Sequence, residues 1–226
     1  MLNTIPTHLV INAAINKKYG SKFKIIRSAF LWGSVAPDIP LFLLSIGYLI
    51  FLRFFTTQSV SAGMTYAFDN LFFNNPLWIV SHNLLHSPTM LVIFALLLWR
   101  SQDQIKLRGK WWLSFVFGNM IHSVVDILTH HDDGPLLFFP FDWQTRFYSP
   151  ISYWDSNHYA GQVFWGEVAI NILLLGYLFF PKMFRYFKKT LWLHCLDSEI
   201  IQPWESCSRA IASNSKSMHF LCFRAG

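Results

Sequence analysis

Residues 163–180 read VFWGEVAINILLLGYLFF, and this apolar run, interrupted by a single carboxylate, decides the class of fold. A helix of about 20 apolar residues is long enough to cross the hydrocarbon core of a bilayer. Three further stretches have the same character: residues 41–55, 76–99 and 111–128. With 53% hydrophobic and 13% charged residues, the chain suits a lipid solvent better than water. We therefore expect an all-α, multi-helix membrane bundle with about four transmembrane helices.

Shorter segments precede and follow these spans. Residues 5–14 are too short to cross a membrane, so they lie in the interface or pack on the bundle. Residues 23–36 end at Pro37-Asp38-Ile39-Pro40, where two prolines stop a helix, and we expect a buried or re-entrant half-helix there. Residues 191–226 are more polar and lack a periodic pattern. The organisation that follows is one membrane-embedded domain, 1–190, and a polar, weakly structured tail, 191–226.

Basic residues are distributed unevenly between the apolar segments. They cluster before the first span, between the second and third, and after the fourth, whereas residues 56–75 contain no Lys or Arg and residues 129–161 contain only Arg146. The positive-inside rule then places both termini in the cytoplasm. The net charge of +6 is better explained by anionic lipid than by nucleic acid, which we do not expect as a partner. We predict an integral protein of the bacterial inner membrane, with membrane lipids as its surroundings.

Two pairs of ionisable side chains lie four residues apart inside the apolar segments. His82 and His86 form the first pair, and His122 with Asp126 repeats the spacing with a carboxylate. Residues four apart share one face of a helix, and imidazole with carboxylate suits zinc, manganese or iron. Either pair can instead be a hydrogen-bonded contact between helices that holds no ion. Because charged groups are costly inside a membrane, we favour a divalent metal, zinc foremost, with one to three ions.

Neighbouring polar residues extend these pairs but also have simpler explanations. His130 and His131 directly follow the third span, and they can simply be its hydrated outer end. Asp38 is well suited to cap the helix that follows it. His8 is a lone histidine near an apolar face, which is more often structural than metal-binding. Asp38 and His8 also fall on the inner side of the predicted topology, away from the two pairs, so one shared site requires residues 23–40 to re-enter the bundle or a different first span.

Several motifs, in this order along the chain, resemble the membrane-bound metal-dependent hydrolases of the YdjM type. They are Thr7-His8-Leu9, residues 33–40, 82–87 and 118–126, and Gly134 to Pro140. That family is similar to the zinc-dependent phospholipases C, which are all-helical and hold three metal ions with His, Asp and Glu ligands. By this likeness the ligands are His8, Asp38, His82 or His86, His122, Asp126, and His130 or His131. The likeness also assigns catalysis to Asp38, His122 and Asp126.

The chain departs from the family pattern at two places. Pro40 and Leu41 follow Ile39, where the family usually has an Asp-His pair. The phospholipase-like His-x-x-x-Glu pair also lacks a clean match, because Gln162 lies four residues after His158. We therefore keep His158 and Glu167 as second-tier metal ligands. For Glu167, pairing with a basic group is the alternative.

The functional hypothesis that follows is metal-dependent hydrolysis. Metal-activated water can cut a phosphate ester without a nucleophilic side chain, and the chain contains no G-x-S-x-G, P-loop or H-E-x-x-H motif. A small-molecule or lipid phosphate ester is the expected substrate, as for a phosphoesterase or phospholipase C-like enzyme. Two alternatives remain open: a metal-ion or solute transporter, and a non-catalytic membrane factor with a vestigial metal site.

Overall fold

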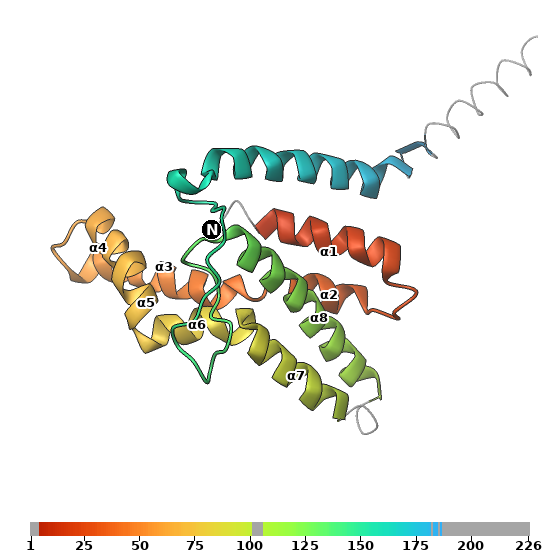
Figure 1. The fold of residues 1–226 in the computed structure, drawn as a ribbon, viewed down its shortest axis with the longest axis horizontal. Coiled ribbons are helices and arrows are strands. Elements are labelled where there is room, and N and C mark those ends of the chain that lie inside the picture. Colours follow the sequence, from red (N-terminus) through yellow and green to blue (C-terminus); the bar gives the residue numbers. More distant parts are fainter. Residues whose placement is uncertain (1–4, 101–105, 182, 185, 187–226) are drawn as a thin grey trace, which may run out of the picture. The chain divides into compact units, whose positions relative to one another are not determined.

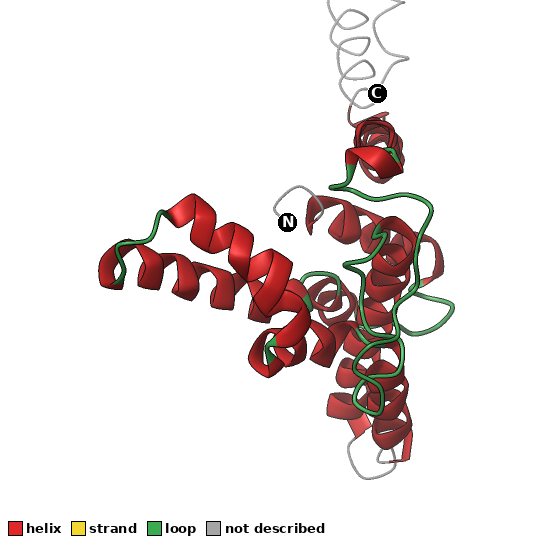
Figure 2. Ribbon diagram, turned by 60° about the vertical axis from the view of Figure 1, so that its left-hand side comes forward, coloured by secondary structure: helices red, strands yellow, loops and turns green. Residues whose placement is uncertain are grey.

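The computed structural model describes residues 5–100, 106–181, 183–184 and 186. Helices dominate this part of the chain, which contains no named strand (Figures 1 and 2). Residues 191–226, predicted to form a weakly structured tail, lie outside the described residues. The chain divides into two compact units after Leu178, and the features discussed below belong to the first unit, apart from the last three residues of the helix Ala160–Pro181. In chain order its named elements are α1 (Ile5–Tyr19), α2 (Arg27–Gly33), α3 (Asp38–Phe55), α4 (Val60–Tyr66), the π-helix η1 (Ala67–Leu71), α5 (Phe72–Asn74), α6 (Pro76–His86), α7 (Pro88–Arg100), α8 (Lys106–Thr129) and the short 3-10 helix η2 (Ser156–His158).

Three helices are long and apolar enough to span a membrane, which confirms the predicted class of fold. They are α3, residues Arg108–Thr129 of α8, and a last helix, Ala160–Pro181. Only 11% of α3 and 6% of Ala160–Pro181 are buried inside the protein, so most of their Leu, Ile and Phe side chains face outward. Such a surface fits lipid, which solvates apolar side chains as well as a protein core does.

The predicted second span, residues 76–99, is not one straight helix. It consists of α6 and α7, whose axes meet at 54° on either side of Ser87. Pro88 explains the break, because proline has no N–H to continue the hydrogen-bond ladder and its ring clashes with the preceding turn. The bend places His86, the last residue of α6, inside the protein instead of along a lipid-facing helix.

The N-terminal segments enter the bundle, as the half-helix hypothesis required. The Asn12 amide on α1 donates to Phe30 O on α2 at 3.3 Å and to Gly118 O on α8 at 3.1 Å. Helices α2 and α8 cross where Gly33 meets Gly118. A Cβ on Gly33 would lie 2.2 Å from Phe115 O, so only glycine permits this approach.

The connection between α8 and Ala160–Pro181 is irregular and packs against the bend. One side chain in α6, one at the bend and one in α7 form hydrogen bonds with the main chain of this connection. Asn83 Oδ1 accepts from Leu136 N at 2.6 Å, Ser87 Oγ donates to Phe139 O at 3.2 Å, and Thr89 Oγ1 donates to Leu137 O at 2.7 Å. Non-helical backbone is tolerated at membrane depth only where the protein satisfies it in this way.

Candidate metal centre

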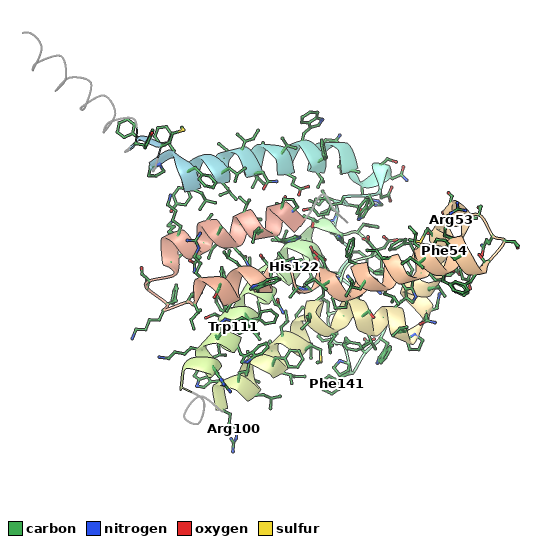
Figure 3. All side chains as sticks on the ribbon, turned by 180° about the vertical axis from the view of Figure 1, so that it is seen from behind. Arg53, Phe54, Arg100, Trp111, His122 and Phe141 are labelled. Atoms are coloured by element: carbon green, nitrogen blue, oxygen red, sulfur yellow. The ribbon has the colours of Figure 1, made fainter. Side chains whose placement is uncertain are left out.

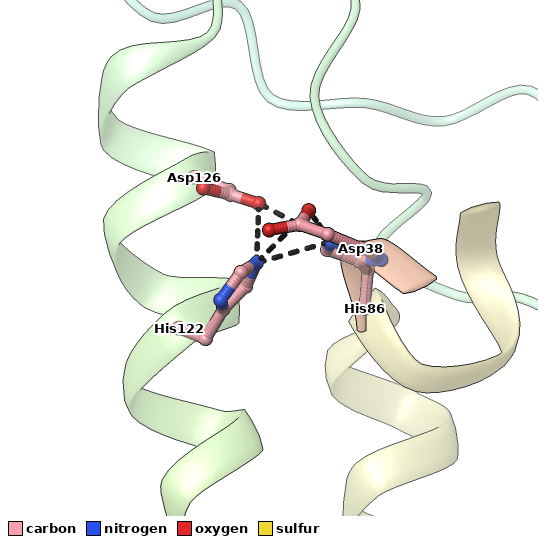
Figure 4. A group of neighbouring side chains, drawn as sticks. All are labelled: Asp38, His86, His122 and Asp126. Carbon is pink, nitrogen blue, oxygen red and sulfur yellow. Dashed lines mark hydrogen bonds and ion pairs between the residues drawn. The ribbon is translucent and has the colours of Figure 1, made fainter. Parts of the chain in front are cut away.

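Four side chains from three helices converge on one point (Figure 4). Asp38 begins α3, His86 ends α6, and His122 and Asp126 lie one turn apart near the end of α8. Each offers one ligand atom, and these four atoms all lie within 4.8 Å of one another. His86, His122 and Asp126 are buried, whereas the side chain of Asp38 is 23% exposed. Figure 3 places His122 among the helices and Phe141 at the periphery.

The distances that link the two imidazoles to each other and to the two carboxylates are close to those between ligands of one zinc ion. The two imidazole Nε2 atoms are 3.1 Å apart, and Asp126 Oδ2 lies 3.1 Å from His122 Nε2 and 3.4 Å from His86 Nε2. Asp38 Oδ1 lies 3.4 Å from His86 Nε2 and 3.6 Å from His122 Nε2. Ligands about 2.0–2.1 Å from a tetrahedral zinc ion are separated by about 3.3–3.4 Å. The two histidines together with either carboxylate are therefore spaced to hold a zinc-sized ion.

Main-chain carbonyls fix both imidazoles in the tautomer that a metal needs. His86 Nδ1 lies 2.6 Å from His82 O, and His122 Nδ1 lies 2.8 Å from Ser34 O. A carbonyl only accepts, so each Nδ1 carries the proton and each neutral ring presents its Nε2 lone pair to the centre. Metal-binding histidines in proteins are oriented by the same kind of bond. Two lone pairs 3.1 Å apart repel unless a cation or proton lies between them.

His8 lies behind the four ligand atoms, where it positions Asp126. Its Nε2 is 3.1 Å from Asp126 Oδ1, the carboxylate oxygen that does not face the centre. Its ring stacks on His122 with centroids 3.9 Å apart. The sequence likeness implied a ligand here; His8 lies outside the group of four, and its role as a metal ligand stays a prediction.

His82 is adjacent to the centre but likewise outside the group. Its ring lies 4.5 Å from that of His86 and 4.9 Å from that of Phe72, between centroids, and its carbonyl orients His86. Its Nδ1 is buried and has no hydrogen-bond partner among the described residues. Of the alternatives His82 or His86, the structure therefore brings His86 to the ligand position.

Asp38 does not cap its helix, so that alternative is wrong. Pro37 occupies the N-cap position and no side chain makes a cap hydrogen bond. Asp38 is instead the first residue of α3, and its carboxylate reaches His86 and His122. The predicted separation of Asp38 and His8 from the two pairs is also wrong, because α1, α2 and the start of α3 enter the bundle beside α8.

The remaining candidates form separate contacts. The rings of His131 and His158 stack with centroids 3.5 Å apart, and His158 Nδ1 donates to Asp155 Oδ2 at 2.7 Å, which lowers the pKa of Asp155. The ring of His130 packs against Tyr153. Burial raises the pKa of Tyr153 to about 12. None of these three histidines belongs to the group of four that the described residues provide.

Glu167 also lies outside the group and joins two helices. It accepts a hydrogen bond from Thr7, whose hydroxyl accepts one from Asn171 at 2.7 Å. The partner of this carboxylate is therefore a hydroxyl, not the basic group that the alternative required. The contact ties Ala160–Pro181 to α1, and Lys17 adds a second one by donating to Leu178 O at 3.2 Å.

Some residues that orient the histidines of the site could not be identified from the sequence. Ser34 contributes only its carbonyl to His122, and Ser123 donates to His86 O. Main-chain acceptors can come from any residue type, so the sequence did not indicate Ser34. Asn83 has a clearer signal, since it is a buried amide between the two histidines of α6.

The fold and the site together define an integral membrane protein with a buried group of two histidines and two aspartates. The chain belongs to the YdjM inner membrane protein family, whose model matches residues 2–190. It is accordingly an inner-membrane protein, and its resemblance to the YdjM type is confirmed. Comparisons with curated proteins and with solved structures give no match. The further likeness to zinc-dependent phospholipases C stays a prediction.

Proposed function

We propose that this protein is a metal-dependent hydrolase that acts on a phosphate ester or phospholipid-type substrate. The observation that supports this best is the convergence of two imidazoles and two carboxylates on one point, with both imidazoles held in the metal-binding tautomer by carbonyls. Two carboxylates and two neutral imidazoles carry a charge of −2 in a largely lipid-facing protein. A divalent cation neutralises that charge, which makes zinc the favoured occupant.

The four side chains have different roles in this proposal. Catalytic zinc sites usually have three protein ligands and an open fourth position. His86, His122 and Asp126 are the buried three, and Asp38 is both more exposed and at the longest distance, 3.6 Å from His122 Nε2. A zinc ion held by these three would polarise a phosphoryl oxygen and acidify a water. Asp38 would be the general base that takes a proton from water, and its Oδ2 is buried with no partner among the described residues.

Substitutions that separate zinc binding from hydrolysis test the roles proposed for these four side chains. We expect His122→Ala to lose both zinc and hydrolysis, because it removes a buried ligand. Asp38→Asn should keep zinc and lose about 10²–10⁴-fold in turnover, the usual contribution of a general base. Metal content by mass spectrometry, beside turnover of a panel of phosphodiesters and phospholipids, measures both effects. His158→Ala is the matched control, since His158 lies outside the group of four, and it should change neither.

Two results would overturn the proposal. One is a wild-type protein that is fully folded and free of metal after purification in the presence of zinc. The other is zinc flux across liposomes without hydrolysis of any ester, which would indicate a transporter instead.

A further inference from the structure

A row of polar residues lies along one side of α1. His8, Asn12 and Asn16 are spaced four apart, so they share a helix face. This face meets α8 antiparallel, because His8 stacks on His122 and Asn12 reaches Gly118 O. Asn119 lies on the His122 side of α8, one turn earlier. We refer to His8, Asn12, Asn16 and Asn119 as the polar seam.

Three residues of the polar seam are buried and Asn16 is partly buried, yet much of the hydrogen-bonding capacity of these four side chains is unused. His8 is 2% exposed, and Asn12 and Asn119 are 0% exposed. Among the described residues, no partner exists for His8 Nδ1, Asn12 Oδ1, Asn16 Nδ2 or either polar atom of the Asn119 amide. Buried polar groups in proteins nearly always have a partner. Five such atoms, four on His8, Asn12 and Asn119 and one on Asn16, therefore indicate a ligand small enough to be enclosed beside them.

The chemistry of these atoms identifies that ligand as water. Asn12 Oδ1 and Asn119 Oδ1 accept, as does His8 Nδ1 when Nε2–H faces the Asp126 carboxylate. The amide nitrogens of Asn16 and Asn119 donate. A metal cation would satisfy only the acceptors and would repel the amide N–H groups. Water both donates and accepts, and enclosed waters typically make about three hydrogen bonds each.

We propose that the polar seam encloses a file of water molecules that runs from the metal centre to the C-terminal end of α1. The eight steps along the helix from His8 to Asn16 rise about 12 Å. At about 2.8 Å per hydrogen bond, this length holds about four waters. Asn16 is partly exposed and is followed by Lys17 and Lys18, so by the positive-inside rule the file opens toward the cytoplasm.

The file gives the site a route for water that is separate from lipid. The outward surfaces of α3 and Ala160–Pro181 are apolar, so they contact lipid, and of the four residues of the centre only Asp38 is partly exposed. Hydrolysis consumes one water per turnover, and the polar seam delivers it to the side of the centre where His8 holds Asp126. The delivery of water for hydrolysis rests on the proposed hydrolase function. The presence of water along the polar seam does not depend on that function.

Radiolytic hydroxyl labelling detects enclosed water directly, since radicals form from waters bound inside a protein. The zinc-loaded full chain in lipid nanodiscs is exposed to X-ray pulses, and oxidation is located by peptide mass spectrometry. We expect His8 to be labelled although it is buried. Trp78, 3% exposed in the apolar cluster with Leu41, Ala67 and Phe72, is the matched control and should remain unlabelled.

Two variants of Asn119 complete the test. Asn119→Leu replaces the amide with an apolar group of similar size and should abolish the labelling of His8, whereas Asn119→Ser keeps a polar group and should preserve it. Absence of His8 labelling in the wild type, or equal labelling in Asn119→Leu, overturns the file. Zinc content of the same preparations tests the hydrolase proposal separately. If Asn119→Leu loses the labelling of His8 but keeps wild-type turnover, the proposal that the file delivers the water for hydrolysis is overturned.

Discussion

Replacing Gly118 with alanine tests the packing of α2 against α8 and, through it, the support of the metal centre. A Cβ at position 118 would lie 2.2 Å from Phe30 O and 3.2 Å from the Cα of Gly33. Both neighbours are main-chain atoms, which cannot rotate away as a side chain does. The two helices must therefore separate, and the bond from Asn12 to Gly118 O lengthens with them.

Two opposing effects determine how much Gly118→Ala changes the free energy of unfolding. Alanine is favoured over glycine inside a helix by about 0.8–1.0 kcal/mol. Overpacking costs about 1–3 kcal/mol, and a clash between two main chains belongs at the upper end of that range. We therefore expect the free energy of unfolding to fall by about 1–2 kcal/mol, which changes the ratio of folded to unfolded protein by about 5–30-fold.

Reversible unfolding of the detergent-solubilised protein by sodium dodecyl sulfate measures this difference. Gly176→Ala is the matched control, because a Cβ at that glycine has no neighbour within 4 Å and only the favourable helix propensity remains. Zinc affinity provides a second readout. Ser34, next to Gly33, orients His122 by its carbonyl, so Gly118→Ala should also weaken zinc binding. Equal stability of the two alanine variants would refute the tight crossing.

Three further predictions concern contacts described above. Asn83→Leu leaves the buried Leu136 N–H without its acceptor and should lower the free energy of unfolding by about 1–3 kcal/mol in the same assay; an unchanged value would contradict the hydrogen bond. Thr7→Val removes the hydroxyl that binds Glu167, and hydrogen exchange in residues 160–178 should become faster, whereas unchanged exchange would mean that other contacts dock this helix. Chelation of zinc should lower the melting temperature of the wild type but not of His122→Ala, because a ligand at 100 times its Kd stabilises a protein by about 2.7 kcal/mol; an equal shift in both proteins would exclude this site as its cause.

The sequence predicted those features that depend on local periodicity. Long apolar runs predicted the helices that the structure contains, and the spacing of four between His122 and Asp126 placed both on one face of α8. Asp38 was different, because its proline-rich surroundings fit a helix cap equally well. Only the family likeness favoured a site role, since nothing local reveals that α3 begins beside His86.

Other features depend on tertiary contacts that no periodicity encodes. The bend at Ser87 requires Pro88, but whether a proline ends a span or merely kinks it depends on what satisfies the freed backbone groups. The separation of His131 from His122 arises because the chain leaves α8 at Thr129 and becomes irregular. His8 has the residue type of a ligand, and only the tertiary structure shows that it lies behind Asp126, outside the group of four.

The packing of residues 136–139 against the bend affects how this part of the chain can change during evolution. Asn83, Ser87 and Thr89 bind its main-chain atoms, so these bonds do not depend on which side chains stand at 136–139. Insertion or deletion of one residue would shift every carbonyl and N–H out of register with all three partners. Leu136 and Phe139 are also buried in an apolar cluster with Ile79, so related sequences should keep the same number of residues here and apolar side chains at these two positions.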